Sequence, residues 1–327
     1  MPRPKAFVTR VIPEAGIERL AGVFDVDVNR DDRQLGAAEI AQRAQGCQAL
    51  VTLLTDRVDG NLLDLCPDVR IVANVAVGYD NVDVAAATAR GVWIANTPGV
   101  LTETTADLAW ALLMATARRL GEAERCVRAG KYHGWGILML LGGDVHGKTL
   151  GLAGFGRIGQ AVAKRARGFE MRVLYTDQQR APEALERETN ATFVDKATLL
   201  AESDFLSLHV PLLPQTRHWL GESELRAMKP TAYVINTSRG PVIDEAALAA
   251  ALRSGWIAGA GLDVFEREPE VQPELLACEN AVLLPHIGSA SIETRDRMAT
   301  IAADNCIAFV RGERPPTAVN EPVRARA

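Results

Sequence analysis

Three side chains able to bind anions or move protons each follow an apolar, strand-like segment in the second half of the chain. Arg239 follows TAYVINTS, Glu268 lies in FEREPE after IAGAGLDV, and His286 follows AVLLP. The carboxyl ends of parallel strands share one edge of a sheet, and ligands of open α/β sheets bind beyond that edge. Each residue alone is compatible with an ordinary surface role, but together they predict one cleft that holds a guanidinium, a carboxylate and an imidazole.

This combination suits the reduction of a 2-oxo acid, which needs a hydride for the carbonyl carbon and a proton for its oxygen. His286 can supply a proton near neutral pH, and Glu268 would orient the imidazole and stabilise its charged form. Arg239 would grip the substrate carboxylate and polarise the carbonyl. The chain has no GxSxG or HExxH motif, so serine hydrolysis is disfavoured and no metal is expected.

A glycine motif could provide the hydride donor's binding site. Gly154, Gly156 and Gly159 form GxGxxG between the strand-like TLGLAG and the helical RIGQAVAKRA. Glycines here allow a tight turn and bring a helix N-terminus close to a pyrophosphate. Asp177 lies roughly 20 residues further on, where a carboxylate binds the adenosine ribose of NAD. Arg180 in the same turn suits a 2′-phosphate, so NAD(H) is favoured and NADP(H) is the alternative.

The bulk composition is that of an ordinary globular chain of one large or two medium domains. It has 327 residues, 48% hydrophobic and 24% charged, and a net charge of −5, which disfavours nucleic-acid binding. The five cysteines form no CxxC pair, which is typical of a reducing compartment. No segment has the length of a membrane span or a secretory signal, so we expect a cytoplasmic protein without a membrane partner.

Strand-like and helix-like segments alternate twice along the chain. They alternate over the first hundred residues, give way to a helical stretch over 102–130, and resume at Lys148. A further helical segment over 289–310 is suited to returning the chain to the first unit. Continuous apolar strands separated by helices predict an α/β fold with parallel sheets flanked by helices.

Seven motifs in order resemble the D-isomer-specific 2-hydroxyacid dehydrogenases, most closely their glyoxylate/hydroxypyruvate reductase branch. They are NVAVGYDNVD, NTPGVLTETTADLAWALLMATARR, GFGRIGQAVAKRA, VPLLPQTRHWL, NTSRGPVIDEAAL, GAGLDVFEREP and LLPHIGSAS. The resemblance implies two Rossmann-like domains in a homodimeric, cytoplasmic enzyme. An NAD(P)-binding domain of residues 100–287 would be inserted into a substrate-binding domain of residues 1–99 and 288–327.

The resemblance also implies roles for individual residues. Arg239, Glu268 and His286 would be catalytic, and Val77 and Gly78 would bind the substrate carboxylate together with Arg239 and His286. The implied coenzyme contacts are Gly154, Gly156, Arg157, Ile158, Gly159, Asp177, Val210, Pro211, Thr216, Thr237, Ser238, Arg239, Asp263, His286 and Gly288, with Thr105 as a further candidate.

Two segments depart from the pattern of the resemblance. The turn TDQQR carries Asp177 where many reductases of this branch have residues suited to NADPH, which favours NADH. The loop YHGWGILMLLGG lacks the proline and second tryptophan often found there, so Trp135 and Met139 either shape the active site or only pack. Leu53 and Leu54 are likewise an apolar wall of the substrate pocket or simply the end of a strand.

The resulting prediction is NAD(P)H-dependent reduction of small 2-oxo acids, such as glyoxylate and hydroxypyruvate, to D-2-hydroxy acids. Two alternatives stay open on the sequence. One is another D-2-hydroxyacid dehydrogenase, or a phosphoglycerate or phosphite dehydrogenase on the same scaffold. The other is a non-catalytic, NADH-sensing protein of the corepressor type, which can retain the same three polar residues.

Overall fold

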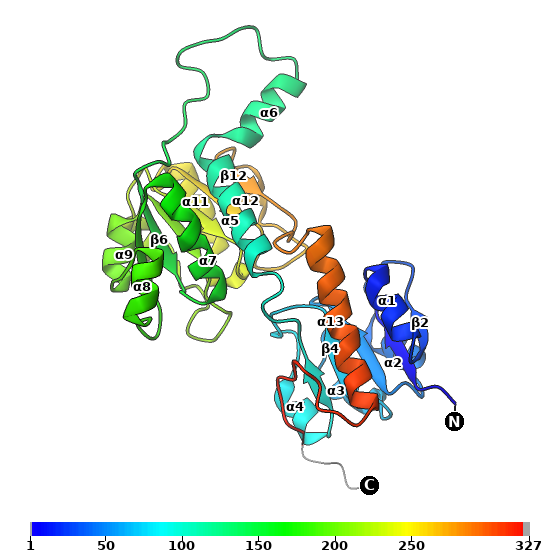
Figure 1. The fold of residues 1–327 in the computed structure, drawn as a ribbon. Coiled ribbons are helices and arrows are strands. Elements are labelled where there is room, and N and C mark those ends of the chain that lie inside the picture. Colours follow the sequence, from blue (N-terminus) through cyan, green and yellow to red (C-terminus); the bar gives the residue numbers. More distant parts are fainter. Residues whose placement is uncertain (1, 323–327) are drawn as a thin grey trace. The chain divides into compact units, whose positions relative to one another are not determined.

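The computed structural model describes residues 2–322 and divides the chain into two compact units (Figure 1). Unit 1 holds the chain up to Leu101 and again from Ser289 onward, and unit 2 holds Thr102–Gly288. These boundaries lie within two residues of the expected ones, and the last five residues of the expected 288–327 segment lie outside the described residues. Each unit is built around its own sheet.

Unit 1 contains a five-stranded parallel sheet with the order β2-β1-β3-β4-β5. The strands are β1 (Lys5–Val8), β2 (Asp25–Val28), β3 (Ala49–Thr52), β4 (Ile71–Asn74) and β5 (Trp93–Ala95). The central strands β3 and β4 are buried at every position because helices cover both faces. The strand order reverses between β1 and β3, so the loops that follow these strands flank a topological switch point.

The helices of unit 1 pack on the two faces of this sheet. They are α1 (Glu14–Ala21), α2 (Ala37–Arg43), α3 (Gly60–Leu65), α4 (Val84–Ala89) and α13 (Ile292–Val310). The last helix returns the chain to unit 1 and lies against α1, where a Cβ on Gly16 would come within 2.6 Å of the Ala299 Cβ (Figure 1). Glycine is therefore what allows these two distant segments to touch.

Unit 2 contains a seven-stranded parallel sheet with the order β12-β11-β10-β9-β6-β7-β8. The strands are β6 (Thr149–Ala153), β7 (Arg172–Thr176), β8 (Ala191–Phe193), β9 (Phe205–Leu208), β10 (Tyr233–Asn236), β11 (Gly259–Leu262) and β12 (Ala281–Leu283). Its order reverses between β6 and β9, which is the dinucleotide-binding arrangement of Rossmann folds. The predicted α/β class with two parallel sheets is confirmed.

Two hydrophobic cores lie on the opposite faces of this second sheet. The helices of unit 2 are α5 (Thr102–Ala117), α6 (Leu120–Arg128), α7 (Arg157–Ala166), α8 (Glu183–Thr189), α9 (Lys196–Glu202), α10 (Glu222–Ala227), α11 (Glu245–Ser254) and α12 (Pro273–Leu276), with 3₁₀ turns η1 (Arg167–Phe169) and η2 (Gly240–Val242). Helices α5 and α7 supply one core, and α9 to α12 supply the other.

The prediction of one continuous helix over 102–130 is wrong. Arg119 adopts a left-handed backbone conformation with φ of +53°, which ends α5 and starts α6 in a new direction. The Arg119 guanidinium pairs with Glu122 at 2.7 Å and donates to the Leu141 carbonyl, which stabilises this break. A sequence with uniform helical composition gives no signal of such a turn.

Among residues 2–322 no helix combines the length and apolar character needed to cross a membrane. Within the same residues no group of three His, Cys, Asp or Glu side chains is placed to hold a metal ion.

Candidate active site

The glycine motif forms the turn between β6 and α7, and its three glycines differ in what a Cβ atom would meet. Gly154 has φ of +94°, and a Cβ there would lie 2.7 Å from the His209 carbonyl carbon. A Cβ on Gly159 would lie 2.3 Å from the Gly154 carbonyl oxygen, so this glycine allows α7 to approach the turn. By contrast, a Cβ on Gly156 would meet nothing within 4 Å. The open space above Gly156 is where a pyrophosphate would approach the backbone.

The N-terminus of α7 is available to an anion. Gly156 is its N-cap, and no side chain caps the helix there. The first N–H groups of a helix have no partner within the helix, and those at Arg157 to Gly159 therefore suit phosphate oxygens. The turn and the helix end fit the dinucleotide that the motif predicts.

Asp177 follows β7 directly and reaches the glycine turn. Its Oδ2 accepts a hydrogen bond from the Phe155 N–H at 2.7 Å, and its Oδ1 accepts one from the Gln178 N–H at 2.6 Å. The carboxylate thus holds the turn as well as standing at the position expected for a ribose contact. Phe155 also stacks on Tyr175 with ring centroids 4.0 Å apart, which fixes the turn from the side of the core.

The segment after β9 approaches the turn from the other side of the switch point. His209 donates its N–H to the Ala153 carbonyl at 2.7 Å, which places Val210 and Pro211 beside the glycines. The Thr216 hydroxyl donates to the Pro211 carbonyl at 2.6 Å and accepts from the Leu213 N–H, so it shapes this loop.

Thr237, at the end of β10, carries a polar atom without a partner. Its side chain belongs to a residue only 8% exposed, and its hydroxyl makes no hydrogen bond to any described residue. A buried hydroxyl without a partner is costly, and a ligand hydrogen bond would remove that cost. Thr237 is among the predicted coenzyme contacts, and this orphaned hydroxyl fits that assignment.

The turn that carries Arg239 is held by Asn236, which is not among the predicted site residues. The Asn236 amide donates to the Arg239 carbonyl at 2.9 Å and accepts from both the N–H and the hydroxyl of Ser238. A Cβ on the following Gly240 would lie 1.9 Å from the Phe265 carbonyl carbon. The loop carrying Arg239 therefore packs backbone to backbone against the loop carrying Glu268.

Asp263 directly follows β11, and its carboxylate holds the loop after β12. Its two carboxylate oxygens accept from the N–H groups of Ile287 and Gly288, each at 2.7 Å. Burial raises the pKa of this carboxyl, and these two hydrogen bonds oppose that effect. The Thr105 hydroxyl on α5 donates to the Gly288 carbonyl at 3.1 Å. Asp263 and Thr105 thus hold in place the two residues that follow His286.

His286 and Glu268 form a direct pair. The His286 Nδ1 lies 2.8 Å from the Glu268 Oε2, and the two side chains are 27% and 31% exposed. His286 has a left-handed φ of +54°, and its N–H donates to the Asp263 carbonyl at 2.9 Å. Since an ionised carboxylate only accepts hydrogen bonds, Nδ1 carries the proton and Nε2 is the nitrogen left for exchange with a ligand.

Glu268 keeps its charge at lower pH than an ordinary glutamate. Burial by itself would raise the pKa of this carboxyl, but the hydrogen bond and charge of His286 lower it. The Phe265 N–H donates to Oε1 at 3.0 Å and the nearby Arg239 charge adds to the same effect. The net pKa lies below the ordinary value, so the carboxylate stays ionised beside the imidazole.

A second buried carboxylate, Glu245, supports this loop and was missed from the sequence. It opens α11, is 5% exposed, and accepts a hydrogen bond from the Glu266 N–H. Its sequence context, DEAAL, reads only as an ordinary helix start. The pairing across 21 residues becomes visible only when the fold brings the segments together.

In unit 1, the predicted carboxylate-binding loop follows β4. The Val77 carbonyl accepts from Asn96 at 2.7 Å, and the Gly78 carbonyl accepts from Asn74 at 3.2 Å. Within residues 2–322 the N–H groups of Val77 and Gly78 make no hydrogen bond. The loop therefore has fixed carbonyls and two free amide donors, which suits an anionic group.

The neighbouring loop after β3 carries Leu53 and Leu54. Leu53 is partly buried and packs on the unit 1 core, whereas Leu54 is 39% exposed. The buried Asp56 accepts from the Leu53 N–H at 2.8 Å and from the Thr9 hydroxyl, so it fixes this loop beside β1. Leu53 is thus partly a core residue, and only Leu54 has much free surface.

Comparison with known proteins identifies the family. The model of the D-isomer specific 2-hydroxyacid dehydrogenase NAD binding domain matches residues 110–288. The glyoxylate reductase of Korarchaeum cryptofilum is 55% identical over 324 residues, which cover 98% of this chain and 97% of the relative. The glyoxylate reductase of Thermococcus litoralis is 53% identical over 325 residues, which cover 98% of each chain. The chain belongs to the D-isomer-specific 2-hydroxyacid dehydrogenase family.

Solved structures resemble this 2-hydroxyacid dehydrogenase over its whole length. An NADPH-dependent glyoxylate/hydroxypyruvate reductase of Sinorhizobium meliloti, solved with NADP and malonate, has a TM-score of 0.89 and 37% identity, and the match covers 100% of each chain. A glyoxylate reductase of Paecilomyes thermophila has a TM-score of 0.85 and 35% identity, with 98% and 99% of the chains covered. The predicted family and the enzyme class of NAD(P)-dependent dehydrogenase are confirmed.

The structure brings many of the predicted site residues of this dehydrogenase together within unit 2. The residues of the glycine turn, Asp177 and the segments after β9, β10 and β11 all lie at the carboxyl edge of one sheet. Val77 and Gly78 belong to unit 1. The individual roles of these residues stay predictions.

Proposed function

We propose that this chain reduces glyoxylate and hydroxypyruvate to 2-hydroxy acids of the D series, with NADH as the preferred coenzyme and His286 as the proton donor. The observation that carries the proposal is the 2.8 Å contact between His286 Nδ1 and Glu268 Oε2. This contact directs the exchangeable Nε2 away from Glu268 and keeps a negative charge behind the ring. Relatives that share 55% and 53% of their residues with this chain are named glyoxylate reductases, which supports the choice of substrate.

The residues of unit 2 would divide the reaction between binding and proton transfer. Bound NADH supplies the hydride that reaches the carbonyl carbon of the substrate. His286 donates the proton from Nε2 to the carbonyl oxygen, and Glu268 stabilises the imidazolium before that transfer. Arg239 would hold the substrate carboxylate and polarise the carbonyl through its guanidinium. The products are the 2-hydroxy acid and the oxidised coenzyme.

Each unit would supply binding groups of its own. We assign coenzyme binding to unit 2, which carries the glycine turn, the uncapped end of α7 and the orphaned Thr237 hydroxyl. We assign a share in binding the substrate carboxylate to the Val77 and Gly78 amides of unit 1, which have no hydrogen-bond partner within residues 2–322.

The test is a steady-state assay of coenzyme oxidation with glyoxylate, hydroxypyruvate and 3-phosphohydroxypyruvate, using NADH and NADPH in parallel. We expect turnover with the first two acids and faster turnover with NADH. The glycerate made from hydroxypyruvate should be the D enantiomer, which chiral chromatography can establish. Coenzyme binding without oxidation of either coenzyme by any of these acids would contradict the proposal and favour a sensing role.

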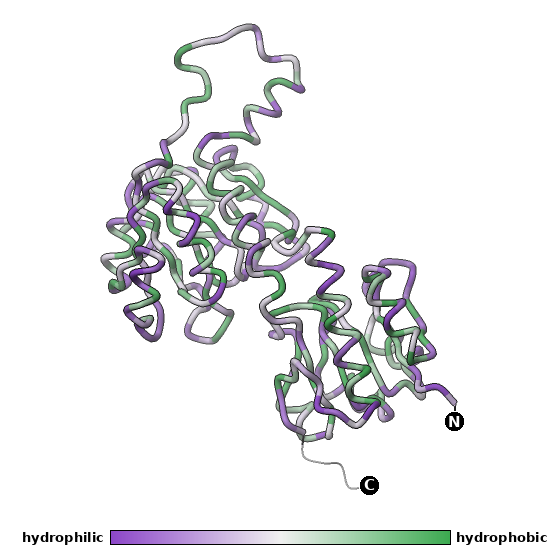
Figure 2. The backbone as a smooth tube through the Cα atoms, in the orientation of Figure 1, coloured by the Kyte–Doolittle hydropathy of each residue, from purple (hydrophilic) through white to green (hydrophobic). Residues whose placement is uncertain are grey.

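We also propose that the protein is a homodimer, because unit 2 carries a helix with no fully buried residue and an exposed apolar loop after it. Helix α6 has nine residues and none of them is buried. Isolated helices of that length are marginal in water, so packing must stabilise this one. The following loop exposes Trp135, Ile137 and Leu138 at 78%, 70% and 78%. We call α6 and residues 129–141 the arm; Figure 2 shows hydrophobic residues along its loop.

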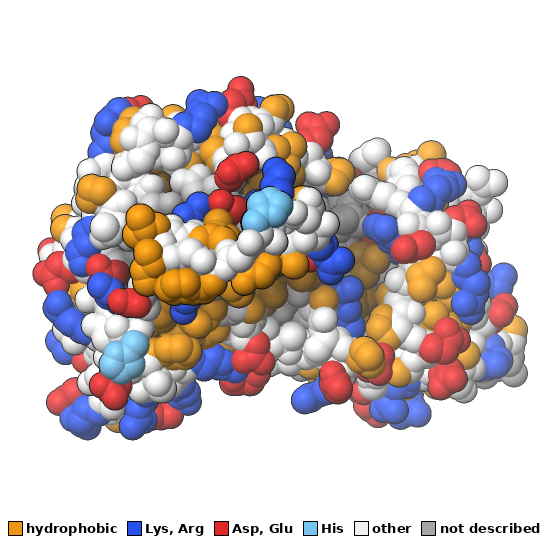
Figure 3. All heavy atoms as spheres, turned by 90° about the horizontal axis from the view of Figure 1, so that it is seen from above, with side chains coloured by type: hydrophobic (Ala, Val, Ile, Leu, Met, Phe, Trp, Pro, Cys, Tyr) orange, Lys and Arg blue, Asp and Glu red, His pale blue; other side chains and the backbone are white. Residues whose placement is uncertain are grey.

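A second copy of the chain is the occupant that fits this arm. Figure 3, which views the molecule from the side of the arm, shows hydrophobic side chains gathered on that face. Exposed apolar surface of this kind is rare in monomers and typical of permanent interfaces. The arm belongs to every copy, so a symmetric pair would cover both arms at once.

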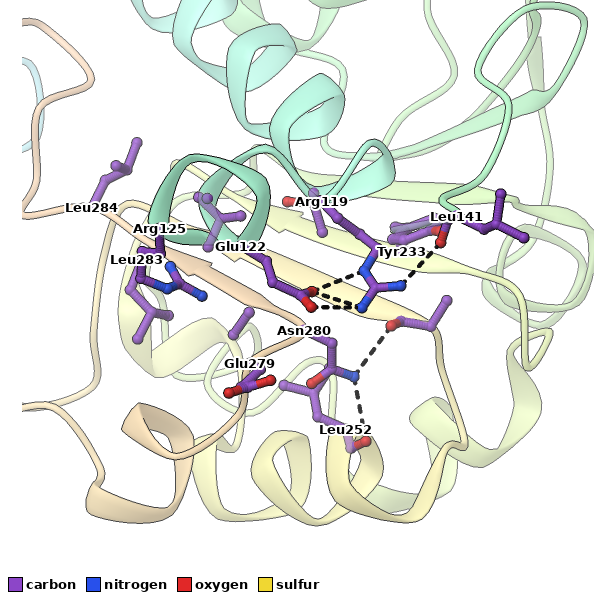
Figure 4. A pocket seen from close by; sticks show the side chains of 15 residues that line it. Arg119, Glu122, Arg125, Leu141, Tyr233, Leu252, Glu279, Asn280, Leu283 and Leu284 are labelled. Atoms are coloured by element: carbon purple, nitrogen blue, oxygen red, sulfur yellow. Dashed lines mark hydrogen bonds and ion pairs between the residues drawn. The ribbon is translucent and has the colours of Figure 1, made fainter. Parts of the chain in front are cut away.

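A cavity of about 680 Å³ lies at the base of the arm, and we assign it to the same interface. Figure 4 shows the Arg119 guanidinium between Glu122 and Leu141, beside Tyr233. Tyr233 is the first residue of β10, so this cavity lies at the amino edge of the sheet. The coenzyme residues lie at the carboxyl edge, and the cavity is therefore not the coenzyme site.

We propose a cytoplasmic location for the protein. All five cysteines are free thiols, and four of them are buried in the two units. Free thiols in a folded protein are typical of a reducing compartment.

A further inference from the structure

The turn after β7 contains one basic residue, Arg180, and its side chain is already engaged. In proteins that bind NADP on this fold, an arginine near this position accommodates the 2′-phosphate. Here Arg180 donates from Nε to the Glu186 Oε1 at 2.9 Å and from a terminal nitrogen to Oε2 at 2.8 Å. Both oxygens of the carboxylate are thus used in a two-pronged ion pair, the strongest geometry available to these groups.

Glu186 is unusually well anchored for a surface helix residue. Its side chain is 8% exposed, whereas the Arg180 side chain is 64% exposed. Its Oε1 also accepts from the Tyr175 hydroxyl at 2.7 Å, and that hydroxyl accepts from the Ala181 N–H at 2.8 Å. Tyr175 is itself fully buried and stacks on Phe155 of the glycine turn. The carboxylate therefore cannot follow Arg180 if the guanidinium moves toward solvent.

Breaking this pair would leave a buried negative charge without its partner. The Glu186 side chain is only 8% exposed, so without Arg180 its charge would keep only the hydrogen bond from Tyr175. The hydrogen bonds from Arg180 and then Tyr175 lower the pKa of Glu186, so the carboxylate is ionised at neutral pH. A 2′-phosphate would have to compete with Glu186 for the one guanidinium of the turn.

We infer that Glu186 is a specificity-determining residue: by holding Arg180 in a two-pronged ion pair, it prevents the coenzyme site from accepting the 2′-phosphate of NADP. The inference rests on the proposed coenzyme position and deepens it. Asp177 would repel the 2′-phosphate by its negative charge. Glu186 holds the Arg180 guanidinium, whose positive charge would otherwise offset this repulsion. Glu186 does this without contacting the coenzyme. The NADPH-dependent relative from Sinorhizobium meliloti indicates that the fold can accept either coenzyme.

The test measures binding rather than turnover. Adenosine 2′,5′-bisphosphate and 5′-AMP differ only in the 2′-phosphate, and calorimetric titration gives the ratio of their affinities. Glu186→Gln keeps the side-chain shape and an acceptor for Tyr175 but removes the charge that holds Arg180. We expect it to raise the affinity for the bisphosphate by about 10-fold, the size of one charge-assisted hydrogen bond, and to leave the affinity for 5′-AMP unchanged.

Two further variants distinguish the release of Arg180 from a general effect of removing a negative charge from α8. Glu183→Gln removes an exposed carboxylate of the same helix, whose partner Arg187 lies one turn away, and should leave both affinities unchanged. Adding Arg180→Ala to Glu186→Gln should abolish the gain. An unchanged ratio in Glu186→Gln, or a gain that persists without Arg180, would overturn the inference.

The inference can also be tested if Glu186→Gln does not fold. Arg180→Ala alone should leave the affinity of the bisphosphate unchanged, because the locked guanidinium does not contribute to it. A drop in that affinity would overturn the inference while leaving the proposed function intact. Failure of the unmodified protein to bind NADH and 5′-AMP would instead contradict the proposed coenzyme site, and the inference would fall with it.

Discussion

At the scale of single residues, the proposed chemistry depends on a carboxylate that stays ionised behind an imidazole. Glu268 receives hydrogen bonds from both His286 and the Phe265 N–H, and its pKa lies below the ordinary value despite partial burial. Its charge is therefore present throughout the neutral range and is lost only in acid. An imidazolium beside this charge is a proton donor held in one orientation.

Replacing Glu268 by glutamine should change the pH dependence of reduction. The amide keeps the size of the side chain but no longer stabilises the imidazolium. At a given pH, less of the proton donor is therefore protonated in the variant than in the parent. We expect the falling limb of kcat/KM in a pH profile to move to lower pH, with lower kcat at neutral pH. Glu270→Gln, an exposed carboxylate two residues further along the same loop, should keep the original profile. Identical profiles for Glu268→Gln and the parent would contradict the assigned role of Glu268.

His209 provides a residue-scale prediction about stability. Burial lowers the pKa of this histidine to about 4, and its Nε2 lies 2.9 Å from the Ser207 hydroxyl. The folded protein therefore keeps His209 neutral, whereas the unfolded chain protonates it below the ordinary histidine pKa of 6.5. Stability from this group is complete above that pH and is lost as the pH falls toward 4.

Denaturant unfolding at pH 7 and pH 5 tests this linkage. His209→Gln removes the group that titrates, so the variant should lose about 1 to 2 kcal/mol less than the parent between these pH values. His146→Gln, which replaces an exposed histidine of the same unit, should lose as much as the parent. Equal losses for the parent and His209→Gln would show that the histidine is not kept neutral by the fold.

At the scale of elements, the coenzyme site depends on the approach of a helix to a turn. The three glycines of the turn differ in what a Cβ would meet, so they can be separated by substitution. Gly156 is the position where a methyl group meets open space rather than protein.

Gly156→Ala should therefore weaken coenzyme binding without unfolding the protein. A Cβ there meets no protein atom within 4 Å, and the backbone φ of −72° suits alanine. We expect the free energy of unfolding to change by no more than about 1 kcal/mol and the Kd of NADH to rise by about 10-fold or more. Gly168→Ala, also free of steric contacts, should leave the Kd unchanged. Normal NADH binding by Gly156→Ala would place the pyrophosphate elsewhere.

The sequence predicts elements and strand-end residues well because both follow from periodic patterns. Arg239 and His286 were selected because each follows an apolar strand, and parallel strands end at a common edge. Asn236 and Glu245 could not be predicted as site residues, because no sequence pattern marks a single polar residue in a strand or at a helix start as functional. The break at Arg119 was missed because helix propensity does not report a single left-handed residue.

At the scale of the whole molecule, the arm is the feature whose apolar side chains are not covered by its own chain. Its exposed apolar side chains and the absence of buried residues in α6 predict association through this surface. From the sequence alone, Trp135 could either pack within its own chain or shape the active site. The structure makes ordinary packing within its own chain an inadequate account, because Trp135 is 78% exposed.

Replacing Trp135 and Leu138 together by serine should shift the protein from dimer to monomer. The two substitutions remove apolar area that would be buried against the second copy, and each buried side chain contributes about 1.5 to 3 kcal/mol. Sedimentation velocity at micromolar concentration would detect the change in mass. Leu276→Ser, at an apolar site on α12 that is 62% exposed, should leave the dimer intact. A parent protein that sediments as a monomer would contradict the proposed dimer.

The central claim is that His286, held by Glu268, protonates the substrate carbonyl while the glycine turn holds the coenzyme. The most direct test measures kcat for hydroxypyruvate reduction and the Kd of NADH on the same preparation of His286→Gln. We predict a fall in kcat of about 10²- to 10⁴-fold, the usual contribution of a positioned general acid, with the Kd of NADH within a few-fold of the parent value. A variant that binds NADH normally and keeps its kcat would contradict the claim.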